Sequence, residues 1–149
     1  MNKRWPLAMF GVVVLGAAVA QPSSGEAVLL RAVNRERQSM GLSALRWDEA
    51  LATAAQQHAN SMAKQGAVSH MLPGEPSLPG RATRAGAHFT SLSENVVEAD
   101  DVQAAHAAFM HSPSHRANIL DGEMNSVGIG VAERGGQVYV VEDFSKAKE

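Results

Sequence analysis

The segment Ser112–Leu120, with the sequence SPSHRANIL, shows most clearly how the second half of the chain folds. Ser112 is a typical helix-capping residue, and Pro113 fits the first helical position, where its missing N–H costs nothing. The residue before a proline disfavours the helical conformation, so a preceding helix must end here. The segment therefore predicts a junction between two helices, with His115 in the first turn of the second one.

The position of His115 at a helix start favours metal binding or proton transfer. Unpaired N–H groups at a helix N-terminus create a positive field. This field favours the neutral imidazole, which is the form that binds metals or accepts a proton. Acidic and histidine partners lie upstream at Glu94 and His70.

Regular elements surround this junction. Asp100 or Asp101 can start the preceding helix, whose apolar face runs from Val102 to Met110. Two strand patterns follow the junction, at Val127–Val131 and Val138–Phe144.

Gly135 and Gly136 join these two strands as a hairpin turn. The charged tail 145–149 is expected to be frayed.

The first half of the chain predicts two further helices. One begins at Glu26 and ends before Gly41, and residues 42–45 form a short connection. The other is capped by Asp48 and ended by Gly66, and its many alanines imply close packing against another layer.

Residues 68–92 are rich in proline and glycine and predict a long loop, a kind of segment that is often functional. A helical turn is expected at Arg81–Ala85, and a short strand or turn at Ser93–Glu98.

The N-terminus has the features of an export signal. Basic residues precede an apolar stretch, Leu7–Ala20, which ends in a small-residue cleavage site and is too short for a comfortable membrane span. An uncleaved anchor is the alternative. Cleavage would leave a short flexible leader, 21–25, and one compact domain, 26–144, exported or in the cell envelope.

Composition excludes several functions. The net charge is −2, and loss of the signal would make it more negative, so nucleic acid and anionic membranes are poor partners. The chain has no cysteine, so it has neither disulfides nor a thiol nucleophile.

The candidate site consists of His70, Glu94 and His115, which all lie at the ends of predicted elements. Two imidazoles and a carboxylate can form an open zinc-type site, with His70 and His115 as ligands and Glu94 as their partner. They can equally form a polar cleft that holds a ligand or polarises a water. The alternative is three unrelated polar residues that tie loops together, since no compact motif such as HExxH is present.

The other polar residues predict structural roles. His58 and His106 lie on or beside apolar helix faces, His88 is an exposed loop residue, and Pro113 separates His111 from His115. The serine at the junction is a helix cap rather than a nucleophile, since no G-x-S-x-G elbow occurs. The arginines are expected to anchor loops, and the glycines of the first strand pattern are not a phosphate cradle.

At these residues the chain resembles the CAP superfamily of cysteine-rich secretory, antigen 5 and pathogenesis-related proteins, and most of all its bacterial SCP-like branch. The resemblance runs from about Glu26 to Phe144. It rests on the order and spacing of these pieces: Val33–Arg37, Leu45–Asp48, Ala55–Met62, Ser69-His70, Ser93–Val96, Phe109–Leu120 and Val127–Val131.

The resemblance implies an α+β fold, a three-layer α-β-α sandwich with a small antiparallel sheet. It also implies a cleft with two histidines and acidic partners, which in some members binds divalent metal. His70 matches the first histidine, Glu94 the acid and His115 the second histidine. Ser93 stands where glycine is usual, and Ser112 stands where many eukaryotic members have a second glutamate.

The resulting expectation is an exported monomeric binding module, whose cleft holds a small ligand, a lipid or a peptide. The only cofactor these residues suggest is a divalent metal such as zinc. Two alternatives remain open: a hydrolase in which His70 and His115 polarise a water while Glu94 orients an imidazole, and a structural protein of the cell envelope.

Overall fold

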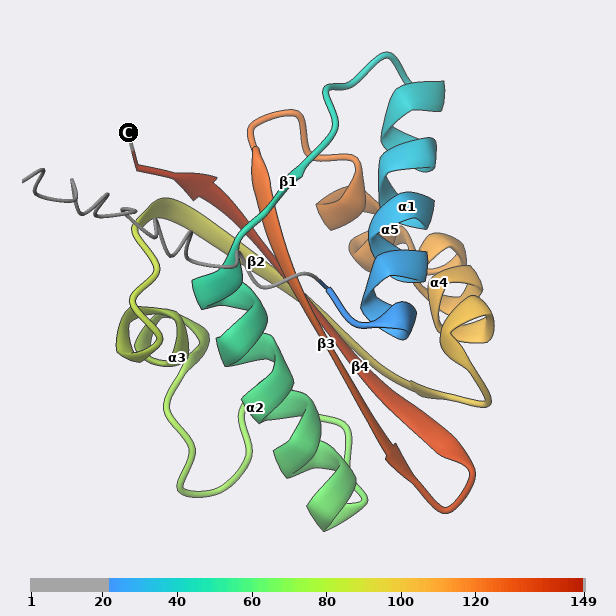
Figure 1. The fold of residues 1–149 in the computed structure, drawn as a ribbon, viewed down its shortest axis with the longest axis vertical. Helices are drawn as coiled ribbons and strands as arrows, with labels where there is room; N and C mark the ends of the chain where they lie inside the picture. Colours follow the sequence, from blue (N-terminus) through green and yellow to red (C-terminus); the bar gives the residue numbers. More distant parts are fainter. Residues whose placement is uncertain (1–21, 149) are drawn as a thin grey trace, which may run out of the picture.

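The computed structural model describes residues 22–148 and contains five helices and one four-stranded sheet (Figure 1). The helices are α1 (Ser24–Ser39), α2 (Glu49–Gln65), α3 (Leu78–Arg84), α4 (Val102–His111) and α5 (Pro113–Ile119). The strands are β1 (Arg46–Trp47), β2 (Phe89–Ala99), β3 (Ser126–Arg134) and β4 (Gln137–Ala147). The predicted export signal lies outside the described residues. Within residues 22–148, every helix is too short or too polar to span a membrane.

The elements form the predicted three-layer α-β-α sandwich. The strand order is β1-β3-β4-β2, and the pairs β3–β4 and β4–β2 are antiparallel. The sheet is not wholly antiparallel, because β1 pairs with β3 in parallel. Strand β1 has only two residues, and no strand pattern marks it in the sequence.

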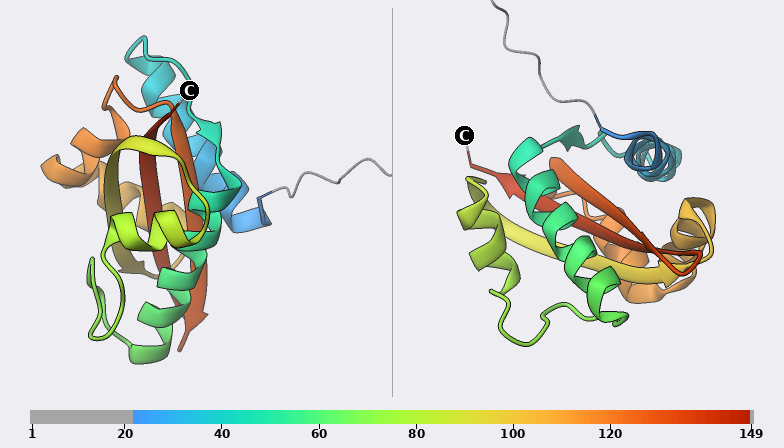
Figure 2. Two further views of the ribbon diagram at one scale, coloured as in Figure 1. Left: turned by 90° about the vertical axis from the view of Figure 1, so that its left-hand side faces the viewer. Right: turned by 60° about the horizontal axis from the view of Figure 1, so that its bottom comes forward.

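Each face of the sheet buries its own apolar cluster. Helices α1, α4 and α5 pack on one face, around Val33, Phe109 and Ile129, whereas α2 packs on the other, around Met62 and Val141 (Figure 2). Side chains alternate between the faces of a strand, so β4 contributes to both clusters. This double burial explains its nearly continuous apolar run.

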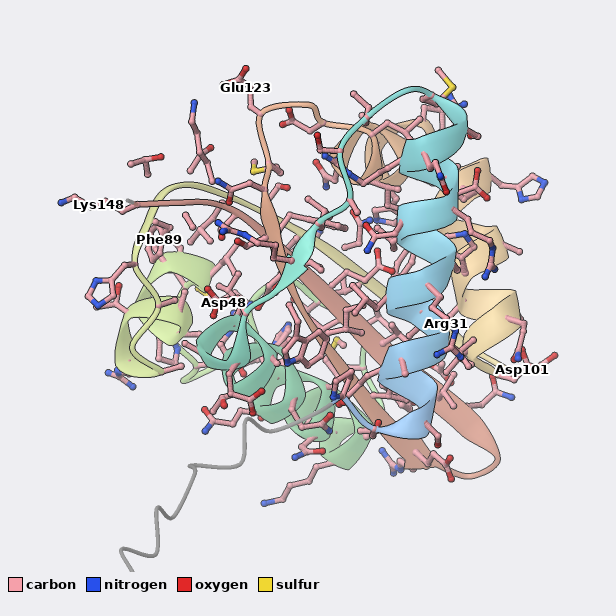
Figure 3. All side chains as sticks on the ribbon, turned by 45° about the horizontal axis from the view of Figure 1, so that its top comes forward. Arg31, Asp48, Phe89, Asp101, Glu123 and Lys148 are labelled. Atoms are coloured by element: carbon pink, nitrogen blue, oxygen red, sulfur yellow. The ribbon has the colours of Figure 1, made fainter. Side chains whose placement is uncertain are left out.

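The predicted helix ends are mostly confirmed. Asp48 accepts from the Leu51 N–H at 3.0 Å, and Asp101 accepts from the Ala104 N–H at 2.8 Å. Both aspartates lie at helix starts in Figure 3. Gly66 ends α2 in the left-handed conformation, with φ of 64°. The hairpin glycines Gly135 and Gly136 also have positive φ, which suits a tight turn between twisted strands.

Several boundaries differ from the predictions. α1 begins at Ser24, inside the predicted leader, because Ser23 and Glu26 form a reciprocal capping box. The predicted loop 68–92 contains all of α3 and the start of β2. The short strand expected at 93–98 is the middle of β2. The tail is not frayed at 145–147, because these residues pair with β2.

Candidate functional site

The structure brings His70 and Glu94 into direct contact. His70 lies between α2 and α3, and its side chain is 62% exposed, whereas Glu94 on β2 is buried. The His70 Nδ1 atom lies 2.8 Å from Oε1 of Glu94. An ionised carboxylate can only accept, so the hydrogen sits on Nδ1. When the ring is neutral, Nε2 of His70 therefore keeps its lone pair and is the nitrogen available to a ligand.

Arg81 binds both Glu94 and the segment that carries His70. It extends from α3, is buried, and donates from Nη2 to Oε2 of Glu94. Its Nη1 donates to the carbonyls of His70 and Pro76, at 3.0 and 3.1 Å. The prediction that Arg81 anchors a loop is confirmed, and the loop that it anchors carries His70.

His115 approaches from the opposite face of the sheet, on α5. Its ring meets the ring of Phe109 edge-on, with centroids 5.3 Å apart. Asn95, the neighbour of Glu94 on β2, donates to the His115 carbonyl at 3.1 Å. Asn118 on α5 donates to Asn95 Oδ1 at 2.8 Å and to the Glu94 carbonyl at 3.3 Å. These bonds hold the first turns of α5 against β2.

His70 and His115 both lie beside the edge strand β2, where His70 contacts Glu94 and the His115 carbonyl accepts from Asn95. Strand β2 is the last in the strand order, so segments on either face can reach around it. The left view of Figure 2 shows α3 beside β2. Burial, and next the charge of His70, lower the pKa of His115. The neutral imidazole predicted for His115 is therefore favoured, but by burial and a neighbouring histidine rather than by the helix end.

A three-ligand metal site is not formed by these residues. Within the described part of the chain, no group of three or more His, Cys, Asp or Glu side chains is placed to hold a metal ion. Both oxygens of Glu94 already have partners, His70 and Arg81. Glu94 is therefore placed behind His70, as the acid that orients an imidazole. Metal binding by His70 and His115 alone stays a prediction.

Two buried acids on the strand next to Glu94 were missed by sequence reasoning. Glu142 and Asp143 on β4 are both fully buried. Asp143 pairs in register with Glu94, and Glu142 pairs with Asn95, whose Nδ2 donates to Glu142 Oε2 at 3.1 Å. The signal was present, because two acids interrupt the apolar run of a strand that must be buried on both faces.

The remaining histidines have the predicted structural roles. His58 is buried and lies 2.8 Å from both the Ser69 carbonyl and Glu75 Oε2. Burial lowers the pKa of His106, against the effect of Glu36. His88 and His111 are exposed, and His111 Nδ1 lies 2.7 Å from the carbonyl of Ala107 in its own helix.

Ser112 occupies the capping position of α5, as predicted, but its side chain does not cap the helix. Its Oγ lies 3.3 Å from Oγ of Ser114 instead.

A cavity of about 620 Å³ lies away from the histidines. It is formed by the starts of α1 and α4 and by the β3–β4 hairpin, and Asp100, Asp101 and Gln137 are among its lining residues. None of the predicted site residues lines this cavity. The carboxylates of Glu26 and Asp101 already cap the two helix starts that border it.

Comparison with known proteins gives one family. The model of the CAP domain, described as the cysteine-rich secretory protein family, matches residues 30–144. Bacillus subtilis (strain 168) YkwD, an uncharacterized protein, is 28% identical over 120 residues, which cover 80% of this chain and 47% of YkwD. The B. subtilis membrane protein YlbC, also uncharacterized, is 27% identical, covering 83% of this chain and 35% of YlbC. The chain therefore spans half or less of the length of these curated relatives.

Solved structures agree with the fold. An extracellular protein of Bacillus anthracis that contains an SCP domain has a TM-score of 0.77 and 25% identity, covering 82% of this chain and 40% of that one. An outer surface protein of Borrelia burgdorferi has a TM-score of 0.78 and 18% identity, covering 87% of this chain and 97% of that one. The second likeness concerns the fold alone.

Proposed function

The chain belongs to the CAP, or cysteine-rich secretory protein, family, and we propose that it is an exported binding module. Its ligand is a small molecule, a lipid or a peptide, held at the cluster of His70, Glu94 and His115. Exposed polar residues on a rigid scaffold are typical of binding sites.

One observation carries the proposal: a solvent-exposed imidazole rests on charged groups that are almost fully buried. The His70 side chain is 62% exposed, while those of Glu94 and Arg81 are 3% and 4% exposed. Burying an ion pair requires that each partner be well satisfied, since desolvation is costly. The buried pair keeps the His70 imidazole fixed while leaving it accessible to solvent. Such an imidazole suits a ligand that donates a hydrogen bond to Nε2.

Export is part of the proposal. The N-terminal pattern of the sequence predicts a cleaved signal. The described residues contain no helix that could cross a membrane, and the B. anthracis relative is an extracellular protein. Mass spectrometry of the protein recovered from the medium or the cell envelope would test it. A mature N-terminus at Gln21 is expected, and retention of residues 1–20 would favour the anchored form.

The binding site can be tested with a panel of ligand classes. Short peptides, esters and fatty acids are added one class at a time, and NMR follows the ring signals of His70 and His115. We expect saturable shifts of both rings with one class. His70→Ala and His115→Ala should abolish the binding, whereas His88→Ala, which removes an exposed histidine elsewhere, should retain it. Binding that survives both site substitutions would contradict this site.

A metal held by His70 and His115 makes a separate prediction. Calorimetric titration with zinc should then give saturable binding by the wild-type protein. Because two imidazoles would be the only protein ligands, either His70→Ala or His115→Ala should abolish this binding. His88→Ala is again the control, and a wild-type protein that takes up no zinc would contradict the metal prediction.

A hydrolase is the second candidate, and the contact between Glu94 and His70 favours it. An imidazole oriented by a carboxylate is a common general base. Activity against the same peptides and esters should fall at least about 100-fold in Glu94→Gln, since general-base catalysis contributes on that order. Activity unchanged in this variant would exclude the proposed role of Glu94.

A further inference from the structure

Asp143 lies directly behind the candidate site. On the antiparallel strands β2 and β4 it is the register partner of Glu94, so the two carboxyl groups are cross-strand neighbours on one face of the sheet. Asp143 is fully buried. No group among residues 22–148 donates a hydrogen bond to either of its oxygens.

Close packing of α2 seals Asp143 from water. Its register partner on the other side is Gly128 of β3, which has no side chain. The backbone of Leu51 and Ala52 in α2 lies directly against Gly128, so close that a methyl group there would clash. An acid enclosed in this way must satisfy its oxygens with protein groups.

Only one of the two carboxyl groups can be ionised at low cost. The charged groups that face Asp143 are Glu94 on β2 and Arg81 on α3. Arg81 already pairs with Glu94. A second carboxylate would lie opposite the first without a cation of its own, and like charges opposite each other are destabilising. Burial, and next the charge of Glu94, raise the pKa of Asp143 well above its usual value, while Arg81 acts in the other direction.

We propose that Asp143 is a positioning residue, which stays a neutral acid and donates its O–H to the Glu94 carboxylate. Glu94 then accepts from three groups: Asp143, Arg81 and the Nδ1–H of His70. With three donors around it, Glu94 holds one orientation, and His70 is kept in the tautomer that leaves Nε2 free. This inference rests on the proposed binding role of His70, although its test needs no ligand.

The first measurement concerns the proton on Asp143. Infrared spectra of the wild-type protein and of Asp143→Asn are compared at neutral pH. We expect the difference spectrum to contain the carbonyl band of a protonated carboxylic acid in the wild-type protein. If instead the substitution removes only carboxylate bands, Asp143 is ionised and the proposal is wrong.

The second measurement concerns His70. Nitrogen NMR of the ring gives the ratio of the two neutral tautomers. Asp143→Asn replaces the O–H donor with an N–H donor, so we expect the Nδ1–H tautomer to stay dominant. Asp143→Val fills the space without a donor, so the excess of that tautomer should fall several-fold.

The matched control is Glu142→Gln, which removes the neighbouring buried acid on the opposite face of the sheet. It should leave the tautomer ratio of His70 unchanged. A His70 signal that stays the same in Asp143→Val, or that changes equally in the Asn and Val variants, would overturn the positioning role. Should the Val variant fail to fold, the infrared result still decides whether Asp143 is protonated, and loss of the tautomer excess in the Asn variant would still overturn its role as a donor. Failure of every ligand to bind would contradict the proposed function and leave these two measurements intact.

Discussion

Among single residues, Glu142 is an acid in an unusual place. It is fully buried on the face of the sheet that packs against α1, α4 and α5, and Asn95 is its hydrogen-bond partner. Burial raises its pKa to about 8, and the hydrogen bond from Asn95 acts in the other direction. Glu142 is therefore mostly neutral at pH 7, which is how an acid without a cationic partner is tolerated in a core.

This group predicts a pH dependence of stability. The pKa of Glu142 is about 8 in the folded state, against an ordinary value of 4.5, so the folded state binds its proton more tightly. This contribution to stability is fully present below pH 4.5 and is lost as the pH rises toward 8. The free energy of unfolding should fall by roughly 5 kcal/mol over this range. Glu142→Gln should remove this part of the pH dependence. Urea unfolding of both proteins from about pH 4.5 to 9 measures it.

The comparison of the two proteins isolates Glu142, since it is the only titratable group that the substitution changes. Asp143 has a raised pKa too, so some loss of stability with rising pH should persist in Glu142→Gln. Equal slopes for the two proteins would show that Glu142 is not the neutral acid described above.

Among the elements, the contact between α2 and β3 sets the spacing of the layers. Gly128 and Gly130 lie under the backbone of α2, at Leu51-Ala52 and Ala55-Gln56. The alanines of α2 complete this contact, and the sequence prediction of a closely packed helix is confirmed. Neither glycine has a positive φ, so space rather than backbone conformation requires them.

Gly128→Ala should therefore destabilise the protein. The new methyl group would clash with the backbone of α2, which cannot rotate away as a side chain can. The expected loss is about 3 kcal/mol or more, at the upper end for overpacking. Thermal or urea unfolding measures it.

Gly122→Ala is the control for this substitution. A methyl group there would meet only Leu42, at an ordinary distance of 3.5 Å, so its effect should stay within about 0.5 kcal/mol. Similar losses in both variants would mean that general backbone effects, and not the α2 contact, are responsible.

In the molecule as a whole, Arg37 connects segments that are far apart in the sequence. It is buried at the end of α1, and it donates to the carbonyls of Ser43, Ile119, Asp121 and Met124 at 2.8–3.2 Å. It thereby ties α1 to the end of α5 and to the turn before β3. The general prediction that arginines anchor loops is confirmed at this position.

Arg37→Met tests this connection. The variant keeps much of the volume but leaves buried carbonyl groups without a donor, so we expect a loss of about 3–5 kcal/mol in the free energy of unfolding. Arg35→Met, on the exposed side of the same helix, should cost less than about 0.5 kcal/mol. A loss below about 1 kcal/mol for Arg37→Met would indicate that water replaces the guanidinium.

The family resemblance implied the layered class of fold. Local sequence signals predict α1, α2, α4, α5 and the hairpin, but only one turn of α3. These signals are apolar periodicity, the caps Asp48 and Asp101, and the glycines Gly66, Gly135 and Gly136. The motif order also indicated His70, Glu94 and His115 as site residues, and the contact between His70 and Glu94 agrees with that prediction.

The surroundings of those residues depend on tertiary contacts. Register on β4 places Asp143 beside Glu94 and Glu142 beside Asn95, and a shift of one residue would exchange the two faces. The contact of Arg81 with Glu94 depends on how α3 docks, and the length of β2 depends on its pairing with β4. These features arise from contacts between distant segments, which no local pattern encodes. The proton on Asp143 is the clearest case, because its position depends on charges that three separate elements bring together.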